Sequence, residues 1–232
     1  MTIGSILTDM VKIFIKYWDV FVLQGIMYTL LLAAIAVLCG TVIGALLAFG
    51  RMSRFKVLRA IIIAFVEVMR GTPALLQLYV GYFLVPMLIP DMNTMPSQLM
   101  AFICVAVALT FNTAAYVSEI IRSGIEAVDK GQTEAARSLG LNNSTTMVSI
   151  VLPQAVKNIL PALGNEFITD IKQTSLASTF FVGELMTSYK TVVGITYNSL
   201  STLFVIGVLY FIMNLILSKG LKFAEKRMKA HA

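Results

Sequence analysis

The stretch SGIEAVDKGQTEAARSLGLNNSTTMVSIVLP, residues 123–153, is the longest polar interval of a chain that is otherwise mostly apolar. Ser123 and Glu126 have the spacing of a capping box, which marks the beginning of a helix. Residues 133–139 favour helix, and Gly140 stands where a left-handed C-terminal cap is expected. We therefore predict a short helix within a polar loop. Its pairable charges and small apolar face suit docking on a soluble partner.

The composition is that of a membrane protein built from several helices. Of 232 residues, 58% are hydrophobic and 13% are charged, and the mean hydropathy is +0.84. A single all-α domain accounts for this length. The net charge of +6 does not indicate nucleic acid, because the basic residues stand beside apolar spans. Cys39 and Cys104 lie within apolar runs, so we interpret them as packing residues and expect no metal site.

Five transmembrane helices are predicted, because about 20 apolar residues cross a bilayer. In the first of them, small residues recur at every fourth position and predict close packing against another helix of the same chain. These small residues are Ala36, Gly40, Gly44 and Ala48. The predicted spans cover residues 21–49, 60–86, 99–121, 159–181 and 195–217.

The flanking segments differ in character from the spans. Residues 1–19 form an amphipathic interfacial segment, residues 20–218 the transmembrane domain, and residues 219–232 a basic tail. Basic residues are concentrated after the first span, after the third span and in the tail. The positive-inside rule places those segments in the cytoplasm and the N-terminus outside.

The second span contains a break at Gly71, Thr72 and Pro73. A broken helix frees carbonyl groups that lipid cannot satisfy, so this turn must face protein or a water-filled passage. Glu67 and Arg70 come just before the break. We favour an internal ion pair or gate formed by these two residues over direct contact with a substrate.

Polar side chains form one stripe on the third span and another on the fourth. Because polar groups are costly against hydrocarbon, both stripes should face the interior of the bundle. Hydrogen bonding between helices and the lining of a transport path are both open interpretations. Two of these side chains on the fourth span are carboxylates, Glu166 and Asp170. They repel each other unless Arg70, Lys172, protonation or a cationic ligand compensates their charge. The candidate substrate-binding residues are Asn112, Thr113, Tyr116, Glu166, Asp170 and Gln173.

Three motifs in order carry a resemblance to a known family. The polar loop has Glu134-Ala135-Ala136, then Gly140, and ends in a Leu-Pro pair at residues 152–153. With EVMRGTPA at residues 67–74 and NEFITDIKQTSL at residues 165–176, the chain resembles permease subunits of binding-protein-dependent ABC importers. It is similar to the branch that imports polar amino acids such as histidine, glutamine and arginine. The resemblance covers residue 24 to the end.

The resemblance implies partners for a chain that is not itself an enzyme. The loop would fit an ATP-binding cassette subunit, and no phosphate-binding glycine motif is found here, so ATP and magnesium belong to that subunit and no cofactor to this chain. A second permease, identical or related, and an extracytoplasmic solute-binding protein complete the complex in a bacterial cytoplasmic membrane. A basic amino acid or glutamine is the favoured substrate. The expected coupling residues are Glu134, Ala135, Ala136, Arg137 and Gly140.

One other class of transporter stays open from the residues alone. An ATP-independent secondary carrier would use Glu166, Asp170 and Lys172 to relay protons or ions. A membrane enzyme is less favoured, because the spans carry neither a metal-ligand cluster nor a serine-histidine arrangement.

Overall fold

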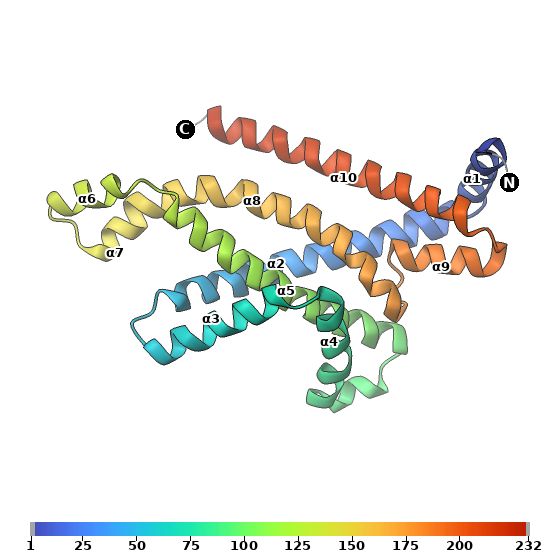
Figure 1. Ribbon diagram of the computed structural model, residues 1–232, viewed down its shortest axis with the longest axis horizontal. Coiled ribbons are helices and arrows are strands. Elements are labelled where there is room, and N and C mark those ends of the chain that lie inside the picture. The colour runs from blue at the N-terminus through green and yellow to red at the C-terminus, as the bar shows by residue number, and fades with distance from the viewer. Residues whose placement is uncertain (1–2, 231–232) are drawn as a thin grey trace.

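The computed structural model describes residues 3–230, and this part of the chain is a set of helices without a strand (Figure 1). The predicted all-α class is confirmed. Met1, Thr2, His231 and Ala232, which belong to the predicted N-terminal segment and basic tail, lie outside the described residues. The helices are α1 (Ile3–Lys16), α2 (Met27–Arg51), α3 (Lys56–Gly71), α4 (Ala74–Leu88), α5 (Ser97–Glu126), α6 (Lys130–Ser138), α7 (Asn143–Thr146), α8 (Leu152–Gln173), α9 (Leu185–Thr196) and α10 (Ser199–Ala230).

Among the described residues, four helical segments are long and apolar enough to cross a bilayer. They cover Asp19–Arg51, Ser97–Glu126, Asn143–Phe180 and Ser199–Arg227. The pair α3 and α4 supplies a fifth span if it is counted as one broken helix, as the sequence predicts. The segment Asn143–Phe180, which contains most of the predicted fourth span, begins earlier than predicted, because residues 143–151 are helical and α8 continues from Leu152 through Pro161. Likewise, α10 continues into the predicted tail as a helix.

Helix α5 lies at the centre of the molecule and packs along α2 (Figure 1). The small residues of α2 face α5 and are buried, as predicted. A Cβ atom at Gly40 would come within 2.9 Å of the Thr113 side chain, and one at Gly44 within 2.8 Å of the Ala114 carbonyl oxygen. The stripe therefore brings two helices of the same chain close together.

The break between α3 and α4 bends the chain by 114°. Thr72 and Pro73 are extended there, so neither helix continues into the other. The Gln77 side chain on α4 donates hydrogen bonds to the carbonyl oxygens of Met69, at 2.7 Å, and Thr72, at 3.1 Å. The freed carbonyl groups thus face protein, which is one of the two predicted environments.

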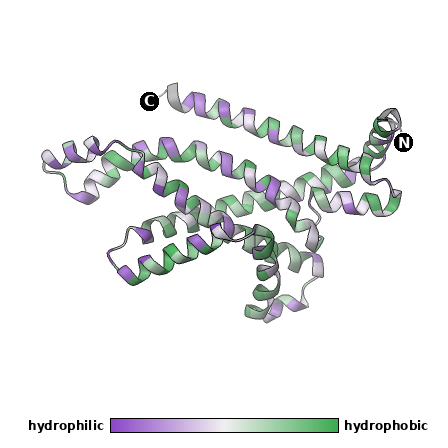
Figure 2. Cartoon of the chain, viewed as in Figure 1, coloured by the Kyte–Doolittle hydropathy of each residue, from purple (hydrophilic) through white to green (hydrophobic). Residues whose placement is uncertain are grey.

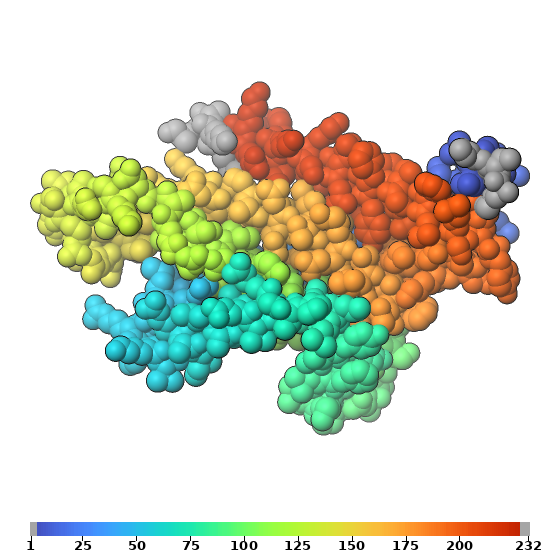
Figure 3. Space-filling view, viewed as in Figure 1, coloured from blue at the N-terminus to red at the C-terminus, as the bar shows by residue number. Residues whose placement is uncertain are grey.

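Helices α6 and α7 project at one end of the molecule, where hydrophilic residues gather (Figures 1 and 2). The space-filling view shows them as a lobe at that end (Figure 3). The predicted capping box is wrong: Ser123 and Glu126 belong to the last turn of α5, which continues past the expected boundary. Asp129 caps α6 instead, accepting a hydrogen bond from the Gly131 amide at 2.6 Å. Gly140 adopts the predicted left-handed conformation, with φ of 83°.

Candidate functional site

The centre of the bundle holds a buried contact between the two predicted polar stripes. On α5, the Thr113 hydroxyl donates a hydrogen bond of 2.8 Å to Oδ2 of Asp170 on α8. Both side chains are completely buried. The site forms here because the small residues of α2 let α5 sit deep in the bundle, with Thr113 held against Gly40. The structure therefore brings together two of the predicted substrate-binding residues.

A third predicted residue, Asn112, joins the same region through a residue that the sequence did not single out. Its side-chain amide donates a hydrogen bond of 2.7 Å to the side-chain amide oxygen Oε1 of Gln77. Gln77 in turn bonds the break between α3 and α4, so Asn112 is linked to that break. A polar residue shortly after Pro73 in an apolar segment was the available signal for Gln77.

Four side chains of this region keep a buried oxygen that accepts no hydrogen bond from a described residue. A buried acceptor without a donor costs about 1–3 kcal/mol, so four of them on the two polar stripes would be expensive in a purely structural site. Buried polar atoms without a partner also occur elsewhere in the described residues, on Ser118, Thr146, Ser201, Tyr210 and Asn214. All four atoms are acceptors and need N–H or O–H donors. They are Asn112 Oδ1, Glu166 Oε1, Asp170 Oδ1 and Gln173 Oε1, and we call these four residues the acceptor group.

The basic residues that could neutralise Glu166 and Asp170 do not pair with them. Within the described part of the chain, neither Arg70 nor Lys172 forms an ion pair with Glu166 or Asp170, and Lys172 is exposed. Of the predicted ways to compensate these carboxylates, protonation and a cationic ligand are consistent with this geometry. Tyr116 is only half-buried, and its ring lies 5.8 Å from the Arg70 guanidinium.

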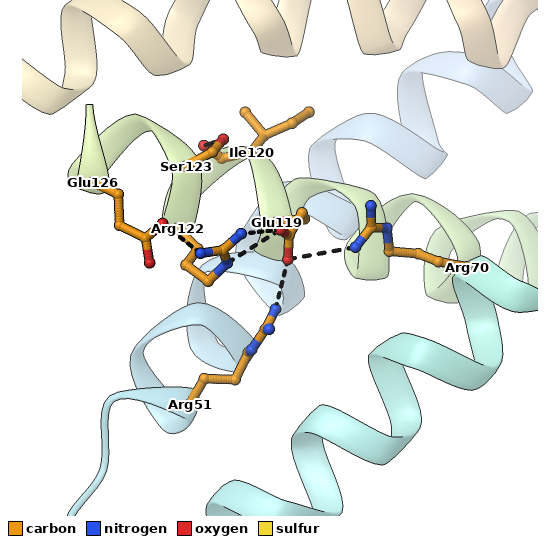
Figure 4. Close-up of polar contacts among 7 residues, drawn as sticks. All are labelled: Arg51, Arg70, Glu119, Ile120, Arg122, Ser123 and Glu126. Atoms are coloured by element: carbon orange, nitrogen blue, oxygen red, sulfur yellow. Dashed lines mark hydrogen bonds and ion pairs between the residues drawn. The ribbon is translucent and has the colours of Figure 1, made fainter.

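Arg70 belongs to an ionic cluster at the end of α5 that leads to α6 (Figure 4). Arg51 on α2 contacts Glu119 at 2.8 Å, Arg70 on α3 contacts it at 3.5 Å, and Arg122 on α5 contacts it as well. Arg122 also pairs with Glu126 at 2.5 Å. Three helices are thus joined at one carboxylate. We call these five residues the ionic cluster.

The predicted ion pair between Glu67 and Arg70 is not formed. Arg70 turns toward Glu119, which three arginines surround, whereas Glu67 is exposed on α3 and makes no ion pair with a described residue. The spacing of three residues within α3 permitted the predicted pair. A carboxylate on the neighbouring helix provided a more enclosed partner, and sequence spacing alone could not reveal it.

The predicted coupling residues lie on the lobe of α6 and α7. Glu134, Ala135, Arg137 and Gly140 are exposed, whereas Ala136 is buried against its own chain. Arg137 contacts the Asn143 side chain on α7 and so braces the two short helices. The exposed surface available to a partner therefore contains Ala135 but not Ala136.

Glu184, which stands between the predicted fourth and fifth spans, is a fully buried carboxylate. It caps α9, accepting hydrogen bonds from the amides of Met186 and Thr187 and from the Thr187 hydroxyl. Burial raises the pKa of Glu184 to about 7, although these hydrogen bonds act in the opposite direction. In the described residues, no group of acidic, histidine or cysteine side chains gathers in a way that would hold a metal ion.

Comparisons with known proteins agree on one family. Residues 40–230 match the family described as the binding-protein-dependent transport system inner membrane component. The chain is 38% identical over 211 residues to the arginine transport system permease protein ArtQ of Bacillus subtilis, covering 91% of this chain and 94% of that one. It is 39% identical over 208 residues to a Rickettsia bellii protein assigned to glutamine transport, covering 90% and 93%. The solved structure titled "Crystal structure of an amino acid ABC transporter with histidines" aligns with a TM-score of 0.84 at 40% identity, covering 92% and 96%.

Proposed function

Because the chain belongs to the family of binding-protein-dependent transport system inner membrane components, we propose that its acceptor group forms the contact with the imported solute. The chain is the permease component of an ABC amino acid importer. The ATP-independent carrier is not favoured, because the relatives and the structural neighbour are components of transport systems of this kind.

The chemistry of the acceptor group supports a substrate that carries several N–H donors. Two carboxylates, Glu166 and Asp170, lie one turn apart on α8 without a protein countercharge. A guanidinium or ammonium group would supply both charge and donors, and an amide would supply donors alone. A basic amino acid is therefore the favoured substrate and glutamine the second. Similarity to an arginine permease and to a protein assigned to glutamine transport supports the same two classes.

The lobe of α6 and α7 supports the proposal of an ATP-driven mechanism. α6 follows α5, and α7 leads into α8, so the lobe is continuous with both helices of the Thr113–Asp170 contact. A partner that moves this lobe would displace the two helices together and change access to the acceptor group. We assign ATP hydrolysis and magnesium to a separate ATP-binding subunit that grips Glu134 and its neighbours.

The remaining partners and the orientation follow the same proposal. A second permease copy or paralogue would enclose the pathway, and a solute-binding protein would deliver the substrate from outside. The α2–α3 connection, the lobe of α6 and α7 and the end of α10 all lie toward the left in Figure 1. These are the segments rich in basic residues, which supports a cytoplasmic location for all three and an external N-terminus in a bacterial cytoplasmic membrane.

Uptake into proteoliposomes by the permease with its ATP-binding subunit and binding protein tests this function. We expect ATP-dependent uptake that prefers a basic amino acid. Uptake that persists without the ATP-binding subunit and stops when the ion gradient is dissipated would establish the secondary carrier instead.

A charge reversal on α6 tests the coupling surface. Glu134→Lys should reduce uptake and substrate-stimulated ATP hydrolysis more than tenfold, because it puts a positive charge where the ATP-binding subunit is expected to contact a carboxylate. Gln132→Lys places a lysine on the same exposed helix, with a charge change of one unit instead of two, and keeps Glu134, so it is the control. Equal coupling in wild type and Glu134→Lys would remove Glu134 from the docking surface.

A further inference from the structure

A pocket of about 360 Å³ lies beside the ionic cluster, between the facing ends of α2, α3 and α5. Three arginines line it, namely Arg51, Arg59 and Arg122, together with a single carboxylate, that of Glu126. The other lining residues are apolar: Ala48, Met52 and Ile63. The pocket therefore has a surplus of positive charge on an apolar floor.

The carboxylates of the ionic cluster do not neutralise all of this positive charge. Glu119 and Glu126 compensate Arg51, Arg70 and Arg122, whereas the Arg59 side chain makes no hydrogen bond or ion pair with a described residue. Arg51 contacts Glu119 through Nη1. A guanidinium group offers five N–H donors, so the pocket keeps donor capacity as well as charge. Phosphate oxygens match this donor arrangement in a bidentate manner.

The surroundings of the pocket indicate which kind of molecule would contain such a phosphate. The α2–α3 connection and the first turn of α3, which supply Met52 and Arg59 to the pocket lining, carry exposed apolar side chains, namely Met52, Phe55 and Leu58. Phe55 is 76% exposed, which is costly in water and favourable against acyl chains. Arg54 and Lys56 add positive charge to the same segment. A basic pocket with an apolar rim at the end of membrane helices is typical of a lipid headgroup site.

We propose that this pocket binds the phosphate of an anionic phospholipid, with Arg59 as its main free donor and the acyl chains against the apolar rim. The bound lipid would connect α3 to α2 and α5 beside Arg51, Arg122 and Glu126 of the ionic cluster. The assignment to the cytoplasmic leaflet rests on the proposed orientation of the permease.

Lipid retention by the purified permease–ATPase complex tests the proposal. The complex is equilibrated with mixed vesicles of phosphatidylglycerol and phosphatidylcholine, and the retained lipids are identified by native mass spectrometry. We expect selective retention of phosphatidylglycerol. Arg59→Gln should reduce that retention about fivefold, the effect of one basic residue near an anionic lipid surface. Arg54→Gln is the matched control, since Arg54 is an exposed arginine of the same connection that does not line the pocket.

Three outcomes would overturn the lipid site. The first is equal retention of the two lipids, and the second is an equal loss in Arg54→Gln and Arg59→Gln, which would mean diffuse attraction. The third is displacement of phosphatidylglycerol by millimolar inorganic phosphate, which would identify a site for the free anion. Retention is measured without transport, so selective lipid binding by a complex that imports no amino acid would refute the proposed function and leave this site standing.

Discussion

The acceptor group and the ionic cluster both include residues of α5, and they differ in whether the chain supplies partners for their polar atoms. In the ionic cluster, both carboxylate oxygens of Glu119 contact arginines, which come from three helices. In the acceptor group, four side chains each keep a buried oxygen without a donor from the described residues. A buried group that the chain compensates fully suits a structural role. A region in which several groups lack compensation suits contact with something outside the chain.

The largest expected effect is on transport, and it distinguishes the acceptor group from the ionic cluster. Glu166→Gln removes a carboxylate for which the chain supplies no countercharge, so uptake at low substrate concentration should fall about 100-fold, as when one partner of a buried charged contact is lost. The melting temperature should stay the same or rise, because the variant removes an uncompensated buried charge. Initial uptake rates and thermal unfolding of the same complex measure both.

Lys172→Gln is the control for this prediction, because it changes one charge on the exposed side of the same helix. Its uptake should stay within twofold of wild type. An equal loss in the two variants would mean that α8 responds to charge in general and that Glu166 is no ligand.

The next effect is on stability and belongs to the ionic cluster. Glu119→Gln leaves three arginines near one another without their shared carboxylate, and should reduce the free energy of unfolding by about 2 kcal/mol. Glu126→Gln, about two turns further along α5 and more exposed, should cost less than about 0.5 kcal/mol. Thermal unfolding in detergent compares them. Similar stability of the two variants would contradict a structural role for Glu119, and so would a change of substrate preference in Glu119→Gln.

The sequence predicts the spans well because lipid imposes a simple rule on composition. The small residues of α2, the break at Pro73 and the left-handed Gly140 are local signals, and each appears in the structure as expected. The polar stripes also face inward, since Asn112, Thr113 and Asp170 are buried. Family motifs then identified the class of transporter, which the comparisons confirm.

Pairing between helices was harder to predict, because several partners satisfy the same spacing. Glu67 and Arg70 are three residues apart, yet Arg70 meets Glu119 on a helix nearly 50 residues later in the chain. The capping box failed for a related reason, since α5 continues through Ser123 once its other turns are packed. Gln77 was missed because its importance comes from the bend that it completes, and that bend exists only in three dimensions.

Gln77 links Asn112 of the acceptor group to the break between α3 and α4, so its substitution tests that connection. Gln77→Leu removes the donor that bonds the Met69 and Thr72 carbonyl oxygens, and it also leaves the Asn112 amide unpaired. The expected loss is about 1–2 kcal/mol in the free energy of unfolding, as for buried groups that lose a partner. Gln77→Glu keeps the shape without the amide donor, and it should be at least as destabilising. Wild-type melting temperatures for both variants would show that the break is held by packing alone.

The smallest effect concerns Glu184, which is buried like Asp170, but both of its carboxylate oxygens accept hydrogen bonds, whereas Asp170 accepts through one oxygen alone. Its pKa is raised from an ordinary value of 4.5 to about 7, so the folded state binds the proton more tightly than the unfolded state does. Stability from this residue is therefore fully present below about pH 4.5 and is lost as the pH rises toward 7. Between pH 5 and 6.5 the melting temperature should fall by about 2–4 °C per pH unit relative to Glu184→Gln. Parallel curves for the two proteins would mean that the hydrogen bonds to Glu184 offset its burial completely.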